Sequence, residues 1–163
     1  MPKIVIGVMG AGEAATPADL ELAHELGRQI ARAGWVTLSG GRDAGVMDAV
    51  SHGAKRENGL TIGILPYRNS SMSEAIDIPI ITDLGNGRNN VNVLSSQIVV
   101  ACGMGAGTAS EIALAIKAGK TVILLNVDRT SQQFFQQFSQ ELVSVTETVE
   151  QTIEAIRQRL KVL

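Results

Sequence analysis

The chain has 163 residues, a length typical of one domain, and a formal net charge of −2. This charge provides no basic field for nucleic acid, and an aromatic content of 3% argues against stacking platforms for single strands. The apolar run Ile4–Ala11 is too short to cross a membrane and lacks the features of a signal peptide. One cysteine allows no internal disulfide, so we expect a cytoplasmic protein.

Short β-branched apolar runs alternate along the chain with longer segments of helical period. In chain order, the runs predicted as strands are Ile4–Met9, Trp35–Leu38, Leu60–Leu65, Ile78–Ile81, Gln97–Cys102, Thr121–Leu125 and Leu142–Val145. The segments predicted as helices between and after them are Ala18–Ala33, Val46–Lys55, Asn89–Ser96, Ser110–Ala118, Ser131–Ser139 and a last helix capped by Thr146 that ends near Lys161. Thr16, followed by Pro17, is the predicted cap of the first helix.

The predicted strands are apolar on both faces, which is typical of a parallel sheet covered by helices on each side. Regular alternation of strand and helix then predicts an α/β fold. We expect residues 1–163 to form a single doubly wound, Rossmann-like domain with a mainly parallel central sheet.

Three glycine-rich loops follow predicted strands: Gly10–Gly12, Ser39–Gly45 and Gly103–Gly107. Ligands of doubly wound sheets bind outside the carboxyl ends of the strands, so the loops are expected to meet at one binding edge. Ser39 stands where an acidic residue would bind the ribose of NAD, and no Walker motif occurs. The loops therefore indicate a ligand site that is neither an ordinary NAD site nor a P-loop.

The third loop leads directly into a predicted helix and has Thr108 as its predicted cap. Free N–H groups and the positive end of the helix dipole favour an anion there, above all a phosphate. Glu111 lies three residues after that cap, where it would close a capping box. It would otherwise point into the binding crevice as a general acid or nucleophile, and the sequence leaves both interpretations open.

Arg42, Arg68 and Arg88 all lie in predicted loops and are the local positive charges available to an anion. Arg88 stands at a predicted helix start, where a cation is disfavoured, so we interpret it as a phosphate clamp. Arg42, inside the second glycine loop, is the next candidate. No metal site is expected, because His24 and His52 are isolated and Cys102 has no partner cysteine.

These motifs carry a family resemblance that covers nearly the whole chain. The run Ser39–Met47 resembles the GGG-x-x-G-L-M turn of the lysine-decarboxylase-like, or LOG, superfamily. The run Gly105–Glu111 is similar to that superfamily's P-G-G-x-G-T-x-x-E signature, and Arg88 falls where the superfamily carries its arginine. The resemblance implies a phosphorylated small-molecule ligand.

Two branches of the superfamily differ in what they imply. One hydrolyses the N-glycosidic bond of nucleoside 5′-monophosphates; the other comprises short molybdenum cofactor carrier proteins, which bind and protect the phosphorylated pterin. Gly87, Asn89 and the pair Gly103–Met104 replace residues of the hydrolase pattern. The resemblance therefore favours a carrier of the molybdenum cofactor that is not an enzyme. The alternatives are a phosphoribohydrolase with Arg88 and Glu111 as catalytic residues, and a nucleotide-sensing module.

The resemblance also implies a set of ligand-binding residues. The phosphate is expected over the helices that open at Val46 and Thr108, and the pterin along Gly10–Gly12. The expected cofactor-binding residues are Gly10, Ala11, Gly12, Ser39, Gly40, Gly41, Arg42, Gly45, Val46, Met47, Arg88, Gly103, Met104, Gly105, Ala106, Gly107 and Thr108.

Apolar helices at 89–96 and 112–118 predict a homo-oligomer, because such helices need cover on both sides. The resemblance points to a homodimer or homotetramer. It also implies molybdoenzymes or proteins of cofactor synthesis as partners, with neither nucleic acid nor a membrane among them.

Overall fold

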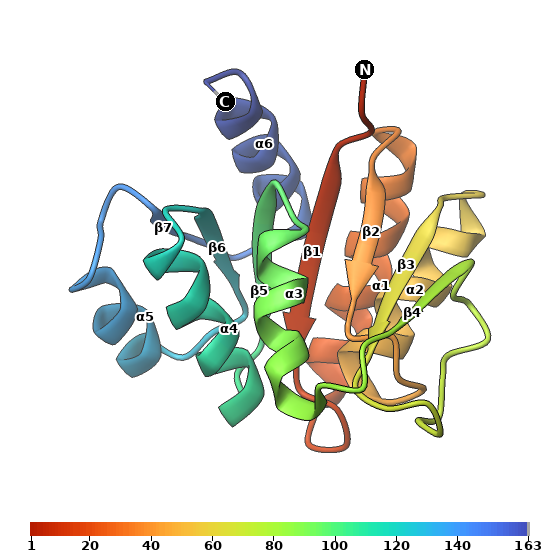
Figure 1. Ribbon diagram of the computed structural model, residues 1–163. Helices are drawn as coiled ribbons and strands as arrows, with labels where there is room; N and C mark the ends of the chain where they lie inside the picture. Colours follow the sequence, from red (N-terminus) through yellow and green to blue (C-terminus); the bar gives the residue numbers. More distant parts are fainter. Residues whose placement is uncertain (163) are drawn as a thin grey trace.

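A seven-stranded sheet forms the centre of the computed structural model, which describes residues 1–162 (Figure 1). The strands are β1 Val5–Gly10, β2 Val36–Ser39, β3 Thr61–Leu65, β4 Ile78–Ile81, β5 Ile98–Cys102, β6 Thr121–Leu125 and β7 Val143–Thr146. Their order in the sheet is β4-β3-β2-β1-β5-β6-β7, and every neighbouring pair is parallel. The predicted strands are all present, and the sheet is parallel throughout.

Helices cover both faces of the sheet, so the predicted doubly wound α/β fold is confirmed (Figure 1). The elements that connect the strands are α1 Pro17–Arg32, α2 Gly45–Arg56, the 3₁₀ turn η1 Gly85–Gly87, α3 Arg88–Leu94, α4 Ala106–Lys117 and α5 Arg129–Gln136, and α6 Val149–Leu160 follows the last strand. One apolar cluster joins α1, α2 and α6 to one face of the sheet. A second cluster joins α3, α4 and α5 to the other face.

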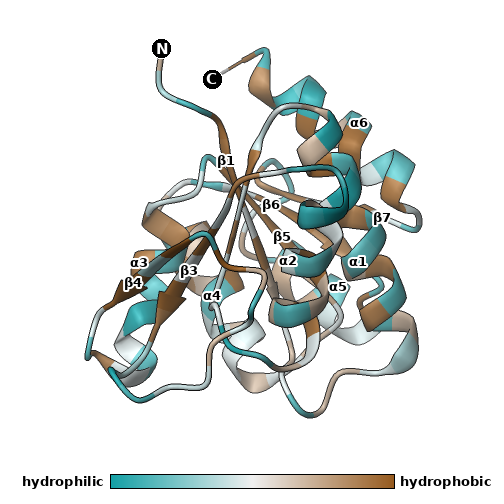
Figure 2. Cartoon of the chain, turned by 90° about the vertical axis from the view of Figure 1, so that its right-hand side faces the viewer, coloured by the Kyte–Doolittle hydropathy of each residue, from teal (hydrophilic) through white to brown (hydrophobic). Residues whose placement is uncertain are grey.

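The core lies in these two layers, and Figure 2 shows mainly apolar strands beside helices that carry both polar and apolar residues. Ile6 and Val8 of β1 pack in the first layer, and Val99 and Ala101 of β5 pack in the second. All four are fully buried. Both faces of the central strands are therefore covered, which explains their continuous apolar sequence.

Helix α1 begins as predicted, whereas α6 does not. The Thr16 hydroxyl accepts from the N–H of Asp19, whose carboxylate accepts from the N–H of Thr16, and this completes a capping box. The cap of α6 is Thr148, so the prediction of Thr146 was wrong. Thr146 still belongs to β7, and its hydroxyl is hydrogen-bonded to that of Thr152 within α6.

Helices α1 and α2 pack closely because each presents a glycine to the other. A Cβ on Gly27 would overlap the carbonyl of Val50, and a Cβ on Gly53 would overlap that of His24. The first two glycine loops lie in the connections that enter these helices, so the close packing of α1 and α2 also brings those connections together.

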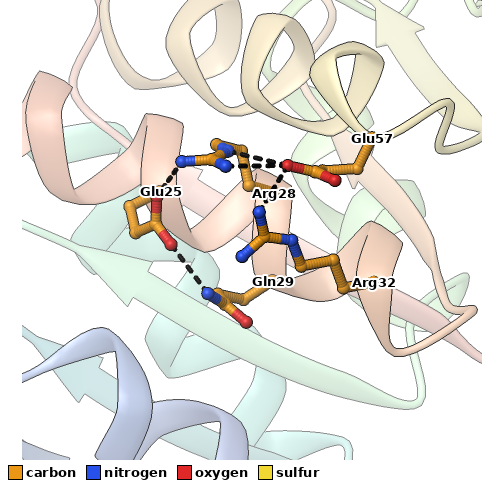
Figure 3. Close-up of polar contacts among 5 residues, drawn as sticks. All are labelled: Glu25, Arg28, Gln29, Arg32 and Glu57. Carbon is orange, nitrogen blue, oxygen red and sulfur yellow. Dashed lines mark hydrogen bonds and ion pairs between the residues drawn. The ribbon is translucent and has the colours of Figure 1, made fainter.

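Ion pairs at the far end of this helix pair reinforce the contact (Figure 3). Arg28 and Arg32 of α1 both donate to the Glu57 carboxylate at 2.8 Å, just after α2. Arg28 also pairs with Glu25 at 3.0 Å. The hydrogen bonds from Arg32 and then from Arg28 lower the pKa of Glu57 below its usual value.

The outer strand β4 is unusual because none of its residues is buried. Ile78, Ile80 and Ile81 are each more than 40% exposed. Pro79 is accommodated because one side of an edge strand needs no backbone donor. No helix within residues 1–162 is both long and apolar enough to cross a membrane.

Candidate functional site

A cavity of about 260 Å³ lies at the carboxyl ends of β1, β2 and β5. The strand order reverses at β1, because β1 has β2 on one side and β5 on the other. This is the switch point where doubly wound folds bind ligands. The lining residues are Val8, Met9, Gly10, Ala11, Gly12, Glu13, Ala14, Gly40, Met47, Asn86, Arg88, Asn89, Gly105, Ala106, Gly107, Thr108 and Glu111.

The N-terminus of α4 forms one wall of the cavity. The helix begins at Ala106 with Gly105 as its cap, so the prediction of Thr108 as the cap was wrong. Gly105 caps the helix without a side-chain hydrogen bond, and the helix begins four residues before the predicted start at Ser110. Within the described chain, the N–H groups of Ala106, Gly107 and Thr108 have no acceptor. All three residues line the cavity, and a Cβ on Gly107 would meet no atom within 4 Å.

Two buried polar atoms near this helix start also lack partners within residues 1–162. The Thr108 hydroxyl is one, on a residue that is 2% exposed, and the Arg88 Nε is the other. Buried polar groups are ordinarily hydrogen-bonded, so these two indicate that a polar ligand or water completes them. Both groups are able to donate a hydrogen bond, and both belong to residues that line the same cavity.

Arg88 begins α3 and is held in place by backbone oxygen atoms. Its Nη1 donates to the carbonyls of Gly40 at 3.1 Å and of Ile64 at 3.0 Å. These contacts fix the plane of the guanidinium at the cavity wall. Burial lowers the pKa of Arg88, while the nearby Glu111 carboxylate opposes this change. An arginine remains a cation despite such a shift, so the cavity keeps a fixed positive charge.

Glu111 lies deeper in the cavity and does not cap α4. The capping-box interpretation was wrong, because the helix begins at Ala106 and Glu111 is therefore more than one turn inside it. Its Oε1 accepts from Asn92 Nδ2 of α3 at 2.8 Å, and the residue is 7% exposed. Burial raises the pKa of Glu111 to about 7, although Asn92 and Arg88 act in the opposite direction.

Helices α3 and α4 are joined at the cavity rim by a short hydrogen-bond chain. Asn89 Nδ2 donates to the Ser110 hydroxyl at 2.9 Å, which donates to the Gly107 carbonyl at 2.6 Å. Asn89 stands directly after Arg88, so this chain fixes the start of α3 relative to the first turn of α4.

The N-terminus of α2 differs from that of α4 because the loop after β1 packs against it. Val46 donates its N–H to the Ala11 carbonyl at 3.0 Å. A Cβ on Gly45 would overlap the carbonyl oxygens of Ala11 and Gly12. Gly45 and Val46 do not line the cavity, so the geometry does not support the expected phosphate position over this helix. Gly45 is needed because the loop after β2 contacts the loop after β1 at this point.

The cavity brings together residues from all three predicted glycine loops. Predicted residues that line it are Gly10, Ala11, Gly12, Gly40, Met47, Arg88, Gly105, Ala106, Gly107, Thr108 and Glu111. Predicted residues outside the lining are Ser39, Gly41, Arg42, Gly45, Val46, Gly103 and Met104. Lining residues that the sequence did not predict are Val8, Met9, Glu13, Ala14, Asn86 and Asn89. Asn86 and Asn89 flank Arg88 in the chain, and this proximity was the signal that could have identified them.

Two of the outlying residues have structural partners. Ser39 ends β2, and its hydroxyl accepts from the Gly41 N–H at 3.1 Å. Gly103 has a φ of +71° and lies against the Asp19 carboxylate, where any side chain would collide. Both residues therefore shape the loops and do not line the cavity.

Arg42 forms an ion pair at the cavity mouth. Its Nη2 lies 2.6 Å from Glu13 Oε1, and Glu13 lines the cavity while Arg42 does not. The Glu13 side chain is 73% exposed, against 33% for Arg42. Arg42, the second predicted cation, is therefore paired with the Glu13 carboxylate at the edge of the site.

The donors suit a phosphate monoester attached to a flat polar group. Three free N–H groups, the Thr108 hydroxyl and the Arg88 guanidinium supply donors for phosphate oxygens. The segment Gly10–Gly12 lines the cavity beside these donors, and the absence of a side chain at Gly10 allows close contact with the Val46 side chain. Across residues 1–162 no group of three or more His, Cys, Asp or Glu side chains is arranged to hold a metal ion.

Fold and cavity together define a Rossmann-like α/β protein with a ligand cavity at its switch point. Residues 3–153 match the SLOG cluster4 family model, and the chain belongs to this family.

Two solved structures share the whole fold. The molybdenum cofactor binding protein of Rippkaea orientalis is 55% identical, with a TM-score of 0.96 over 98% of this chain and 99% of that one. The molybdenum cofactor carrier protein of Chlamydomonas reinhardtii is 48% identical, with a TM-score of 0.95 over the same shares. A cytokinin riboside 5′-monophosphate phosphoribohydrolase of Mycobacterium tuberculosis is 33% identical over 97 residues, which are 57% of this chain and 51% of the enzyme.

Proposed function

We propose that this protein binds the molybdenum cofactor and carries it without chemically changing it. The observation that carries the proposal is the open N-terminus of α4, with its unpartnered donors beside Arg88. Identity of 48–55% over nearly the whole chain to proteins named for binding or carrying this cofactor supports it. The cavity offers what a phosphorylated pterin requires, namely anion donors and a glycine-lined space.

The phosphate of the cofactor is held by the N–H groups of Ala106, Gly107 and Thr108 and by the Thr108 hydroxyl. Arg88 supplies the charge, and the contacts with Gly40 and Ile64 orient it in advance. The pterin lies along Gly10–Gly12. Because these donors are fixed by the fold, binding orders few side chains and loses little conformational entropy.

The direct test is purification of the protein from cells that make the cofactor, followed by mass spectrometry of the bound small molecules. The loaded protein is then mixed with an apo-molybdoenzyme, and recovered activity is compared with cofactor incubated in buffer alone. We expect the cofactor in the purified protein and slower loss of its activity. A purified protein that contains no pterin and gives no protection would contradict the proposal.

A phosphoribohydrolase is the second candidate, because the structure places Arg88 and the buried Glu111 in one cavity. A carboxyl group with a pKa near 7 has the properties of a general acid. Release of free base from a panel of nucleoside 5′-monophosphates tests this function, with Glu111→Gln as the variant that should abolish it. A nucleotide that co-purifies without being hydrolysed would instead identify a sensing module.

We further propose that the protein is a cytoplasmic homo-oligomer, a homodimer or homotetramer, that delivers cofactor to molybdoenzymes. Leu94 at the end of α3 is 56% exposed, and Leu84 before η1 is 58% exposed. Covering such side chains with a second copy would remove them from water. Light scattering at micromolar concentration tests this assembly, and a monomer there would contradict it. Cys102 is buried and free, which suits a reducing compartment.

A further inference from the structure

Glu111 is placed to interact with whatever anion binds at the start of α4. It follows Gly107 by four residues and Thr108 by three, so all three lie on one face of the helix. Side chains of a helix lean towards its N-terminus, which directs the Glu111 carboxyl towards the free N–H groups. Residue 111 lines the same cavity as those donors.

Only one carboxyl oxygen of Glu111 is engaged by the protein. Oε1 accepts from Asn92, while Oε2 has no hydrogen-bond partner among residues 1–162. Asn92 is fully buried and neutral, and its own carbonyl oxygen also lacks a partner there. Because burial of the Glu111 carboxyl group is the largest influence on its pKa, the pKa rises to about 7. This carboxyl group therefore titrates near neutral pH before any ligand binds.

The remaining charges around the cavity do not neutralise Glu111. Arg88 at the start of α3 is the cation that acts on it, and a bound anion would share this cation. At the mouth, Arg42 is already paired with Glu13. Behind the loop before α4, the Asp19 carboxylate accepts from the Asn126 amide and from the Thr16 N–H, and Asp19 does not line the cavity.

We propose that Glu111 takes up a proton when an anion binds at the N-terminus of α4, so that the site binds anions more tightly as the pH falls. An ionised Glu111 and a bound phosphate would be two anions in one partly desolvated cavity. Protonation removes this repulsion and turns the carboxyl into a hydrogen-bond donor for the ligand. The cavity thereby links cofactor uptake and release to pH. This inference rests on the proposed function, in which a phosphate occupies this helix end.

Sulfate is the suitable probe, because it resembles phosphate but does not itself titrate between pH 5.5 and 8.5. Calorimetric titrations of the whole protein with sulfate, in buffers of different ionisation enthalpy, measure the protons taken up per anion. We expect a fraction of a proton taken up near pH 7 and affinity about tenfold tighter at pH 5.5 than at 8.5, the change for one pKa unit.

Two variants separate Glu111 from the general charge of the protein. In Glu111→Gln we expect no proton uptake and nearly the same affinity at both pH values. Glu141→Gln, an exposed carboxylate distant from the cavity, should behave as the wild type. Sulfate binding without proton uptake, or equal uptake in Glu111→Gln, would overturn the inference and leave the anion site intact. Failure of sulfate to bind at either pH would overturn the anion site, and with it both proposals.

Discussion

The N–H of Val46 donates a hydrogen bond to the carbonyl oxygen of Ala11 at 3.0 Å, across two glycine loops that are distant in the sequence. This contact engages the start of α2 with the loop after β1. The start of α4 has no such contact within the described residues, so its donors remain free. Two glycine-rich helix starts at one sheet edge thus have different roles, one structural and one open to a ligand.

Substitution of a glycine should therefore affect mainly anion binding at the start of α4 and mainly stability at the start of α2. In Gly107→Val, the new side chain enters open space, so we expect loss of anion binding with a change below about 0.5 kcal/mol in the free energy of unfolding. In Gly45→Ala, a φ of +54° and overlap with the Ala11 and Gly12 carbonyls should destabilise the fold by about 2 kcal/mol or more. Titration with a phosphate monoester and urea unfolding measure both. Binding that survives in Gly107→Val would exclude this helix start as the anion site.

Removal of Arg88 should weaken binding and stability together. A lost charge-assisted contact corresponds to about 1.5–3 kcal/mol, so Arg88→Ala should bind a phosphate monoester about ten- to a hundredfold more weakly. The carbonyls of Gly40 and Ile64 lose their donor, and we expect unfolding to become easier by about 1–3 kcal/mol. Arg68→Ala, in an exposed loop, is the control and should change neither quantity. Unchanged affinity in Arg88→Ala would refute its role as the clamp.

Stability should fall with rising pH because of Glu111. Its pKa is about 7 in the folded protein against a usual 4.5, so the folded state binds more protons between these values. The protein therefore loses stability as pH rises from 4.5 to 7 and levels off above, by roughly 3 kcal/mol for this group. Glu111→Gln should match the wild type near pH 4.5 and be more stable at pH 8. Urea unfolding at both pH values checks this, and parallel curves for the two proteins would contradict it.

Glu13→Gln should strengthen anion binding. The substitution removes a negative charge from the cavity wall and releases Arg42 from its 2.6 Å ion pair. Because the pair is exposed, we expect a gain of only about two- to fivefold, which high salt should abolish. Titrations with sulfate at low and high ionic strength measure the effect, with Glu141→Gln as the control. A weaker affinity in Glu13→Gln would mean that the ion pair itself shapes the site.

Periodicity predicted the elements well because the strands of this sheet are buried on both faces. Continuous β-branched runs such as Ile98–Cys102 have one interpretation when helical segments follow them. The Thr16 cap was also predictable, because a hydroxyl directly before Pro17 is a local signal. Caps that depend on where a neighbouring strand ends were predicted less well, as Thr146 and Thr148 show.

The site was predictable only as a set of loops. Glycine spacing identified Gly105 and Gly107, which line the cavity, because glycine occurs where backbone must be exposed or closely approached. It did not distinguish them from Gly45 and Gly103, which are glycines for contact with another loop or with Asp19. Both kinds look the same in a sequence, because the atom that excludes a side chain belongs to a distant segment.

The sequence by itself therefore determined the α/β class, the parallel sheet and the sheet edge at which the cavity lies, since these follow from local periodicity and turn chemistry. Only the tertiary structure decided which helix start remains open and how Arg88 is oriented. It also decided that Glu111 is a buried acid that does not cap α4. Burial and partner atoms fixed these outcomes, and both arise from segments such as α3 and α4 that meet only in the folded chain.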